Sequence, residues 1–249
     1  MKETFYRIDA GMEMRLALIT DIHNRRGLEV VESLEKQRPQ IILLAGDLVQ
    51  RKRSEIHNGE IINRNVPLEE KQENVLPFLS DCCGVAPVYM SLGNHEWMLS
   101  SRDLEDLRNT GAIILDNEWV RESSLVIGGL TSGGFYGYKK EPRSEWLEEF
   151  EKEPGFRLLL CHDPEYWAIK SPYLANRNID LVLSGHAHGG QIRIFGHGLF
   201  SPGQGLIPKY TGGLFDGPKG KMIVSRGLSN TVPVPRLGNP TELIYIDLY

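Results

Sequence analysis

Five apolar runs of this chain each end in residues that can bind a metal ion, and this repetition is the strongest constraint on its fold. The runs lie within residues 15–24, 41–50, 85–97, 157–167 and 181–190. Short continuous apolar runs are typical of strands that are buried on both faces of a parallel sheet. Because ligands of open α/β sheets bind where the strands end, the five runs predict one shared site at one edge of a sheet.

The polar residues at these strand ends have the chemistry of metal ligands. They are Asp21, His23, Asp47, Asn94, His95, His162, His186 and His188, and they include five of the seven histidines of the chain. Asp and Asn also favour turns, and two neighbouring histidines can simply form hydrogen bonds in a loop. That alternative would have to hold separately at all five strand ends, so we favour a metal site.

The ligand types narrow the choice of ion and the number of ions. Imidazole and carboxylate ligands without thiolate suit Mn, Fe, Zn or Co, and Mn is our first choice. Seven of these candidates would already exceed what one such ion needs, whereas two ions about 3.5–4 Å apart can hold both the attacking and the leaving oxygen of a phosphoryl transfer. We therefore expect two divalent ions, with the Asp47 carboxylate as the bridge between them.

The segments between the runs predict an α/β fold with mixed sheets. Helices are expected over residues 27–40, 68–81, 100–111 and 144–153. Pro77 should kink or divide the second of these helices. Residues 112–120 and 124–130 are too close in sequence for a helix between them, so they predict a hairpin that begins a second sheet.

The ends of the chain and its composition complete the expected architecture. Residues before 15 look like a polar lead-in, and residues 51–67 look like a surface loop. Two late strands are expected over residues 221–227 and 242–249. Because the composition shows no break, we expect one domain over residues 1–249.

Charge and cysteine content argue against several classes of protein. The net charge is −5, and no extended basic stripe is present, so general nucleic-acid binding is not expected. The amino terminus lacks the apolar core of a secretory signal, and no run is long enough to span a membrane. Two of the three cysteines, Cys82 and Cys83, are adjacent, which argues against a disulfide framework. We expect a cytoplasmic protein, with Cys161 as a buried structural residue that strand alternation points away from the metals.

These motifs resemble those of the calcineurin-like metallophosphoesterases. The shared set is Asp21-x-His23, Gly46-Asp47, Gly93-Asn94-His95-Glu96, His162 and Gly185-His186-x-His188, in the order typical of the family. The resemblance implies a four-layer α/β/β/α sandwich with a binuclear metal site. It also implies that one ion is held by Asp21, His23, Asp47 and His188, and the other by Asp47, Asn94, His162 and His186.

The resemblance also gives His95 a role beside the ions, where it would stabilise the transition state or protonate the leaving oxygen. Members of the family often carry a second Asp three residues after the first, where this chain has Gln50. Gln50 can accept a hydrogen bond from an imidazole but cannot supply negative charge to an imidazolium.

Residues 185–194, 201–213 and 225–230 resemble a bacterial subfamily of phosphodiesterases and UDP-2,3-diacylglucosamine pyrophosphatases. Three residues are weaker candidates for substrate contacts. Arg51 either contacts a phosphate or lies in a solvated loop, Gly189 either lets the backbone approach a substrate or only permits a turn, and Arg226 is a candidate for facing the pocket.

We expect a metal-dependent hydrolase that cleaves a phosphodiester or pyrophosphate bond by attack of a metal-bridging hydroxide. Its substrate would be a phosphorylated small molecule, a nucleotide or a lipid-linked phosphate. The alternatives are a phosphomonoesterase, a nuclease of the same superfamily, or a scaffold that has lost catalysis.

Overall fold

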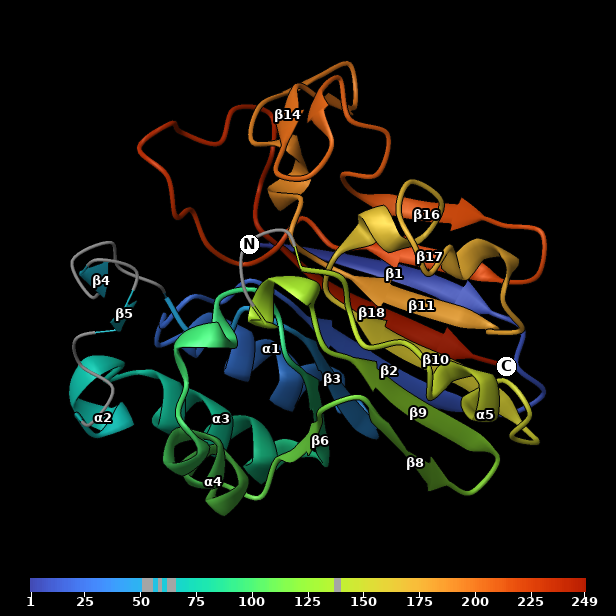
Figure 1. The fold of residues 1–249 in the computed structure, drawn as a ribbon, viewed down its shortest axis with the longest axis horizontal. Coiled ribbons are helices and arrows are strands. Elements are labelled where there is room, and N and C mark those ends of the chain that lie inside the picture. The colour runs from blue at the N-terminus through green and yellow to red at the C-terminus, as the bar shows by residue number, and fades with distance from the viewer. Residues whose placement is uncertain (51–55, 58–59, 62–65, 137–139) are drawn as a thin grey trace.

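Two six-stranded sheets pack face to face in the computed structural model, which describes residues 1–50, 56–57, 60–61, 66–136 and 140–249 (Figure 1). In spatial order the first sheet holds β1 (Lys2–Ile8), β18 (Glu242–Leu248), β2 (Met14–Ile19), β3 (Ile41–Ala45), β6 (Val88–Ser91) and β7 (Ile113–Leu115). The second sheet holds β16 (Gly213–Asp216), β17 (Lys221–Val224), β11 (Leu181–Ser184), β10 (Phe156–Cys161), β9 (Leu125–Leu130) and β8 (Glu118–Glu122).

Helices cover the outer face of the first sheet and, to a smaller extent, that of the second. The first face carries α1 (Leu28–Gln37), α2 (Leu68–Lys71), α3 (Val75–Val85) and α4 (Ser101–Asn109). The second face carries α5 (Leu147–Phe150) and short 3₁₀ turns. The expected mixed α/β fold with four layers is therefore present.

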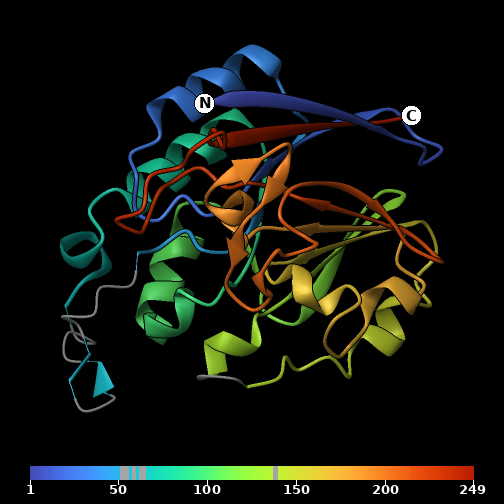
Figure 2. The same cartoon turned by 90° about the horizontal axis from the view of Figure 1, so that it is seen from above.

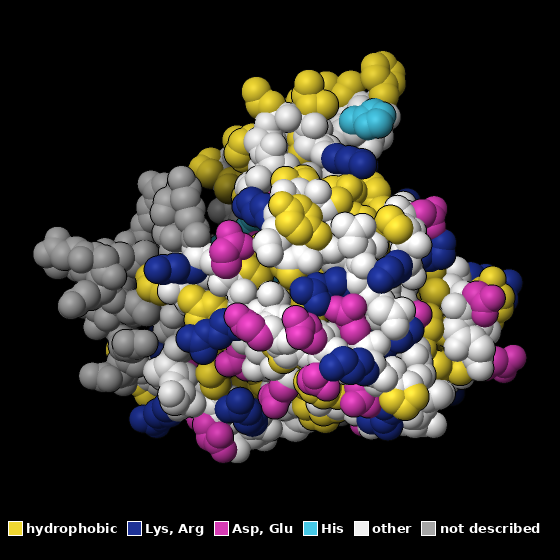
Figure 3. All heavy atoms as spheres, turned by 45° about the vertical axis from the view of Figure 1, so that its right-hand side comes forward, with side chains coloured by type: hydrophobic (Ala, Val, Ile, Leu, Met, Phe, Trp, Pro, Cys, Tyr) yellow, Lys and Arg dark blue, Asp and Glu magenta, His cyan; other side chains and the backbone are white. Residues whose placement is uncertain are grey.

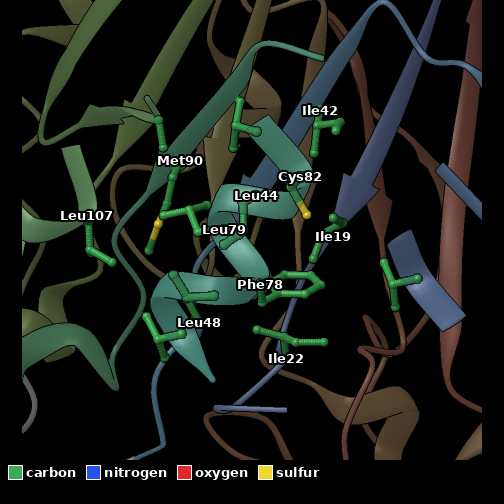
Figure 4. Close-up of a cluster of buried hydrophobic side chains, with 14 of the residues drawn as sticks. Ile19, Ile22, Ile42, Leu44, Leu48, Phe78, Leu79, Cys82, Met90 and Leu107 are labelled. Carbon is green, nitrogen blue, oxygen red and sulfur yellow. The ribbon is translucent and has the colours of Figure 1, made fainter. Parts of the chain in front are cut away.

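Three buried clusters hold these layers together, and they explain the continuous apolar runs. Along β2, Leu16 and Leu18 face the second sheet, whereas Ala17 and Ile19 face the helices. Figure 4 shows the helix side, where Phe78 and other residues of α3 pack over the sheet. Because both faces of the central strands are buried, these strands cannot alternate between polar and apolar residues.

Three short two-stranded units lie outside the two main sheets. They are β4 (Ile56–His57) with β5 (Glu60–Ile61), β12 (Arg193–Ile194) with β13 (His197–Gly198), and β14 (Phe200–Ser201) with β15 (Gly205–Leu206). The last two rise above the sheets in Figure 1. None of the helices in the described part of the chain has the length and apolar character of a membrane span.

The structure corrects the expected strands at two places. The prediction of a polar lead-in before residue 15 is wrong, because Lys2–Ile8 forms β1 at the edge of the first sheet. Most residues of β1 are partly or fully exposed there. Residues 112–120 do not form one strand: β7 pairs with β6 in the first sheet, and β8 pairs with β9 in the second. The chain thus changes sheets at Asp116-Asn117, and the hairpin is β8–β9.

Two expected helices also differ from the prediction. The helix over residues 68–81 is divided, but before Val75 rather than at Pro77. Pro77 lies in the first turn of α3, where its missing N–H is not needed. The helix over residues 144–153 is limited to the four residues of α5. The helices over residues 27–40 and 100–111 are confirmed as α1 and α4, and α4 begins with a Ser100–Asp103 capping box.

Candidate metal centre

The five predicted strand ends lie at one edge of the two sheets and bring their polar side chains together. Asp47, after β3, is at the centre of the group. Its Oδ2 atom lies 3.2 Å from Nε2 of His162, 3.7 Å from Nε2 of His23 and 3.9 Å from Nε2 of His95. These histidines follow β10, β2 and β6, so both sheets contribute to the group.

The described residues form four triads of potential ligand atoms, each with all atoms within 4.8 Å of one another. Three of them consist of predicted residues: Asp21–His23–His188, His23–Asp47–His95 and Asp47–His162–His186. The fourth, Asp163–Glu165–His186, adds two carboxylates that were not predicted. The two aspartates also connect the strand-end loops. Asp47 Oδ1 accepts a hydrogen bond of 2.9 Å from the backbone N–H of His95, and the Asp21 carboxylate accepts one of 3.2 Å from that of His186.

Two of the histidines have their hydrogen-bonding partners arranged for metal binding. His162 Nδ1 lies 2.8 Å from the Ala45 carbonyl, and His23 Nδ1 lies 3.2 Å from the Val49 carbonyl. Because a carbonyl can only accept, each Nδ1 carries a proton, so each Nε2 would present a lone pair to a bound ion when its imidazole is neutral. Such a partner on the far nitrogen is the usual arrangement of histidines that bind metals.

Three side-chain acceptor atoms at the strand ends lack hydrogen-bond partners within the described part of the protein. His23 Nε2, His162 Nε2 and Asn94 Oδ1 are buried and accept no hydrogen bond there. Buried polar atoms are normally satisfied, so this group of unsatisfied acceptors requires an explanation. A divalent cation would satisfy them, and the mixture of imidazole, carboxylate and amide donors fits a transition metal.

His188 differs from the other histidines of the centre. Its Nε2 lies 3.5 Å from Asp21 Oδ1, but its Nδ1 lies 3.1 Å from Nη2 of Arg236. Since a guanidinium only donates, His188 Nδ1 accepts here, and a neutral His188 then carries its proton on Nε2. Arg236 must therefore turn away from Nδ1 before His188 can bind an ion through Nε2.

Burial and charge set the protonation of the centre. Burial lowers the pKa of His23 to about 4, so this imidazole is neutral near pH 7. For Asp47, burial opposes ionisation, but His162, His95 and His23 nevertheless hold the pKa of its carboxyl well below the usual range. Burial likewise opposes charge on His162, but Asp47 raises the pKa of that imidazole well above its usual value. Without an ion, Asp47 and His162 therefore behave as a buried ion pair.

The backbone is strained where the ligands lie. Asp21, His23, Asp47, His186 and His188 all have positive φ angles, between 45° and 64°. Residues other than glycine rarely adopt this region, and such strain concentrates at functional sites. Gly93 allows the loops to approach closely, because a Cβ atom there would lie 2.4 Å from Asp47 Oδ1.

Glu96 holds two of these loops together and was not among the predicted site residues. Its carboxylate is fully buried and accepts hydrogen bonds from the backbone N–H groups of Asp47, Leu48, Val49 and Gly93, at 2.7–3.2 Å. Burial and the neighbouring Asp47 carboxylate raise the pKa of Glu96 to about 7, and the backbone donors oppose this shift. Its position next to His95 in a conspicuous motif was the only available signal in the sequence.

The remaining predicted residues either lie apart from the central group or fall outside the residues that the structure describes. Arg51 falls outside the described residues. Arg226 forms an ion pair of 2.5 Å with Glu242. Gly189 is buried with a positive φ of 65°, and a Cβ atom there would lie 2.1 Å from Asn239 Oδ1, so the observed role of this glycine is in the turn. Cys161 is buried in the cluster on the outer face of the second sheet, as expected.

Known proteins resemble this chain in sequence over most of its length. The uncharacterized metallophosphoesterase YkuE of Bacillus subtilis is 34% identical over 221 residues, which cover 87% of this chain and 70% of YkuE. LpxG of Chlamydia muridarum, a UDP-2,3-diacylglucosamine pyrophosphatase, is 32% identical over 148 residues, which cover 56% of this chain and 42% of LpxG. Several other curated bacterial relatives are much longer, and the chain spans only 49% to 64% of their length.

Structural comparison and a family model agree with these sequence matches. The crystal structure of a dimetal phosphatase from Danio rerio has a similar fold, with a TM-score of 0.53 at 13% identity, covering 86% of this chain and 87% of that chain. The model of the family described as calcineurin-like phosphoesterase matches residues 14–190, which include all the strand ends of the centre. The chain therefore belongs to the calcineurin-like phosphoesterase family, whose members are metal-dependent phosphoester hydrolases.

Proposed function

We propose that this protein hydrolyses a phosphodiester or pyrophosphate bond at a binuclear centre formed by the strand-end residues. The observation that carries the proposal is the position of Asp47, whose Oδ2 atom lies within 4 Å of histidines from three different strands. A carboxylate between two groups of imidazoles is suited to bridge two ions. The seven residues proposed as ligands are Asp21, His23, Asp47, Asn94, His162, His186 and His188.

Divalent ions bound here would supply an activated water and positive charge for the phosphoryl oxygens. The residues of the chain would hold the ions and exclude bulk water, since Asp21 and His162 have no exposed surface. His95 is the most exposed of the three histidines around Asp47, with 16% of its side chain accessible. It is therefore our candidate for the group that donates a proton to the leaving oxygen.

The charges around the centre support a diester or a pyrophosphate over a monoester. A monoester dianion needs more positive charge than a diester, and among the described residues the two guanidinium groups beside the centre already have partners: Arg226 pairs with Glu242, and Arg236 donates to the backbone carbonyls of Arg226 and Ser229 and to His188. The pyrophosphatase activity in the name of LpxG agrees with this preference. A phosphomonoesterase remains the second candidate, and its activity can be measured in the same assay.

The test combines metal content with hydrolysis. Purified protein should bind two equivalents of Mn²⁺ by elemental analysis and should hydrolyse bis(p-nitrophenyl) phosphate faster than p-nitrophenyl phosphate. Loss of a residue that supports a metal ligand costs about 10–100-fold in activity, so Asp47→Asn or His162→Ala, which alter ligands directly, should cost at least about 100-fold. The exposed His197→Ala is the matched control and should retain full activity. Full activity of Asp47→Asn would refute the centre, and a higher kcat/KM for the monoester would refute the substrate preference.

A further inference from the structure

An exposed apolar surface lies next to the candidate centre. We define the apolar crest as Phe195, Phe200, Leu206 and Ile207, from the two small hairpins, with Val232 and Val234 from the following loop. Phe195 is 97% exposed, Leu206 80% and Ile207 83%. Figure 3 shows hydrophobic side chains gathered at the upper end of the molecule, above the sheets. A concentration of exposed apolar side chains marks a surface that binds a protein or a membrane.

The crest is held outward by its backbone. The Ile207 N–H donates to the Leu199 carbonyl at 3.0 Å, and the Leu199 N–H donates to the Ile192 carbonyl at 2.9 Å. Phe195 and Ile207 have positive φ angles of 49° and 52°, which is unfavourable for a β-branched residue such as isoleucine. Strained backbone concentrates at functional sites, so its presence at exposed apolar tips indicates that the crest has a binding role.

The part of the chain that carries the crest is positively charged. The crest segments, residues 191–215 and 228–241, contain Arg193, Lys209 and Arg236 and no Asp or Glu, which gives them a net charge of +3 in a chain whose total is −5. Lys209 has no carboxylate partner among the described residues and lies 5.1 Å from the ring centre of Tyr210. Acidic side chains are therefore concentrated in the rest of the molecule.

A cavity connects the crest to the candidate centre. It has a volume of about 340 Å³, and its walls include Phe200 and Leu199 from one segment of the crest region and Val232 and Val234 from the other. His188 forms part of the same wall. An apolar surface and a proposed metal ligand thus border the same hollow.

We propose that the crest docks onto the surface of an anionic lipid bilayer. Apolar tips on hairpins that carry Arg193 and Lys209 and no acidic residue suit the boundary between acyl chains and anionic headgroups. A second copy of the chain fits less well, because it would bring the same positive charge to the contact. Docking would turn the cavity beside His188 toward the membrane. It does not require hydrolysis, so it can be tested even if the proposed function fails.

The experiment is vesicle flotation with phosphatidylcholine alone and with 30% phosphatidylglycerol. The wild type should float with the anionic vesicles, and 0.5 M NaCl should weaken this binding. Because removing apolar side chains from water drives insertion into the bilayer, Leu206→Ser/Ile207→Ser should reduce the partition coefficient at least about tenfold. The matched control is Leu28→Ser/Ile113→Ser, whose side chains are 55% and 39% exposed elsewhere on the surface. It should bind like the wild type.

Thermal melting will show whether each variant is folded, and Phe195→Ser replaces the crest pair if that pair does not fold. The proposal is overturned if the wild type binds neither vesicle or if the crest variants bind as well as the control. It is also overturned if light scattering shows a dimer that the crest substitutions convert to a monomer, because the crest would then be a protein interface.

Discussion

The candidate metal centre and the apolar crest border the same cavity but are built in opposite ways. The ligands of the centre are mostly buried and are positioned by the register of two six-stranded sheets, so each depends on residues far away in the sequence. The crest is exposed and is positioned by strands of only two residues each. Both regions contain strained backbone, but the buried Glu96 carboxylate accepts from four backbone N–H groups of the centre, whereas the buried Glu165 carboxylate accepts from the Gln204 side chain of the β14–β15 hairpin.

This difference indicates which properties can change independently. A substitution in the centre disturbs strand ends from both sheets, so chemistry and stability should change together. A substitution at a crest tip alters only a local hairpin, so binding should change without loss of the fold. Three experiments test whether the two regions do change independently.

Burial of the centre should make the metal-free protein sensitive to acid through His23. Its pKa is about 4 in the folded protein and about 6.5 in an unfolded chain, so the unfolded state binds more protons between these values. Its contribution is present above pH 6.5 and is lost as the pH falls toward 4, and it amounts to about 3 kcal/mol. In the presence of chelator, the free energy of urea unfolding of the wild type should therefore fall more steeply over this pH range than that of His23→Asn. His197→Asn should follow the wild type, and parallel curves for all three proteins would contradict the assignment.

Removing the Glu96 carboxylate should affect both activity and stability. Glu96→Gln places an amide N–H₂ against backbone N–H groups, which leaves buried donors unsatisfied and should cost about 1–3 kcal/mol in the free energy of unfolding. Because the Asp47 loop shifts as a result, hydrolysis should fall by about 10–100-fold. The exposed Glu70→Gln should change neither quantity. A stable variant with normal kcat/KM would show that the strand ends hold their positions without Glu96.

The smallest effect is expected at the crest. Leu206→Ser/Ile207→Ser should change the free energy of unfolding by less than about 0.5 kcal/mol, since both side chains protrude into solvent. Its kcat/KM for bis(p-nitrophenyl) phosphate should equal that of the wild type. A loss as large as that of Glu96→Gln would show that the crest contributes to the fold, and the contrast drawn above would be wrong.

The sequence predicted the central strands well because these strands are buried on both faces, which leaves a continuous apolar run. It failed for β1, since an edge strand has no such run. It also failed at residues 112–120, because β7 and β8 have similar propensities and nothing local encodes that they join different sheets. Pairing between distant strands, rather than local preference, decided both cases.

Prediction of the site from the sequence was limited in the same way. The strand-end residues were visible as motifs, and the structure brings Asp21, His23, Asp47, His95, His162, His186 and His188 into overlapping triads. The contact between Arg236 and His188 joins residues that are 48 positions apart, and no local pattern signals it. The crest was missed for a similar reason, because apolar residues in a glycine-rich segment give no sign of whether they are buried.

The pairing of β1 with β18 has a consequence for the synthesis of the protein. β18 lies between β1 and β2 in the first sheet, and Figure 2 shows the two terminal strands, β1 and β18, side by side. The Thr4 hydroxyl donates a hydrogen bond to the Glu242 carboxylate across a separation of 238 residues. The ribosome must therefore synthesise the chain through Glu242–Leu248 before the first sheet can form completely. Until then, β1 and β2 lack the strand that lies between them. Such distant pairing slows folding and leaves strand edges exposed meanwhile. We expect the nascent chain to remain incompletely folded, and open to chaperones, until β18 emerges.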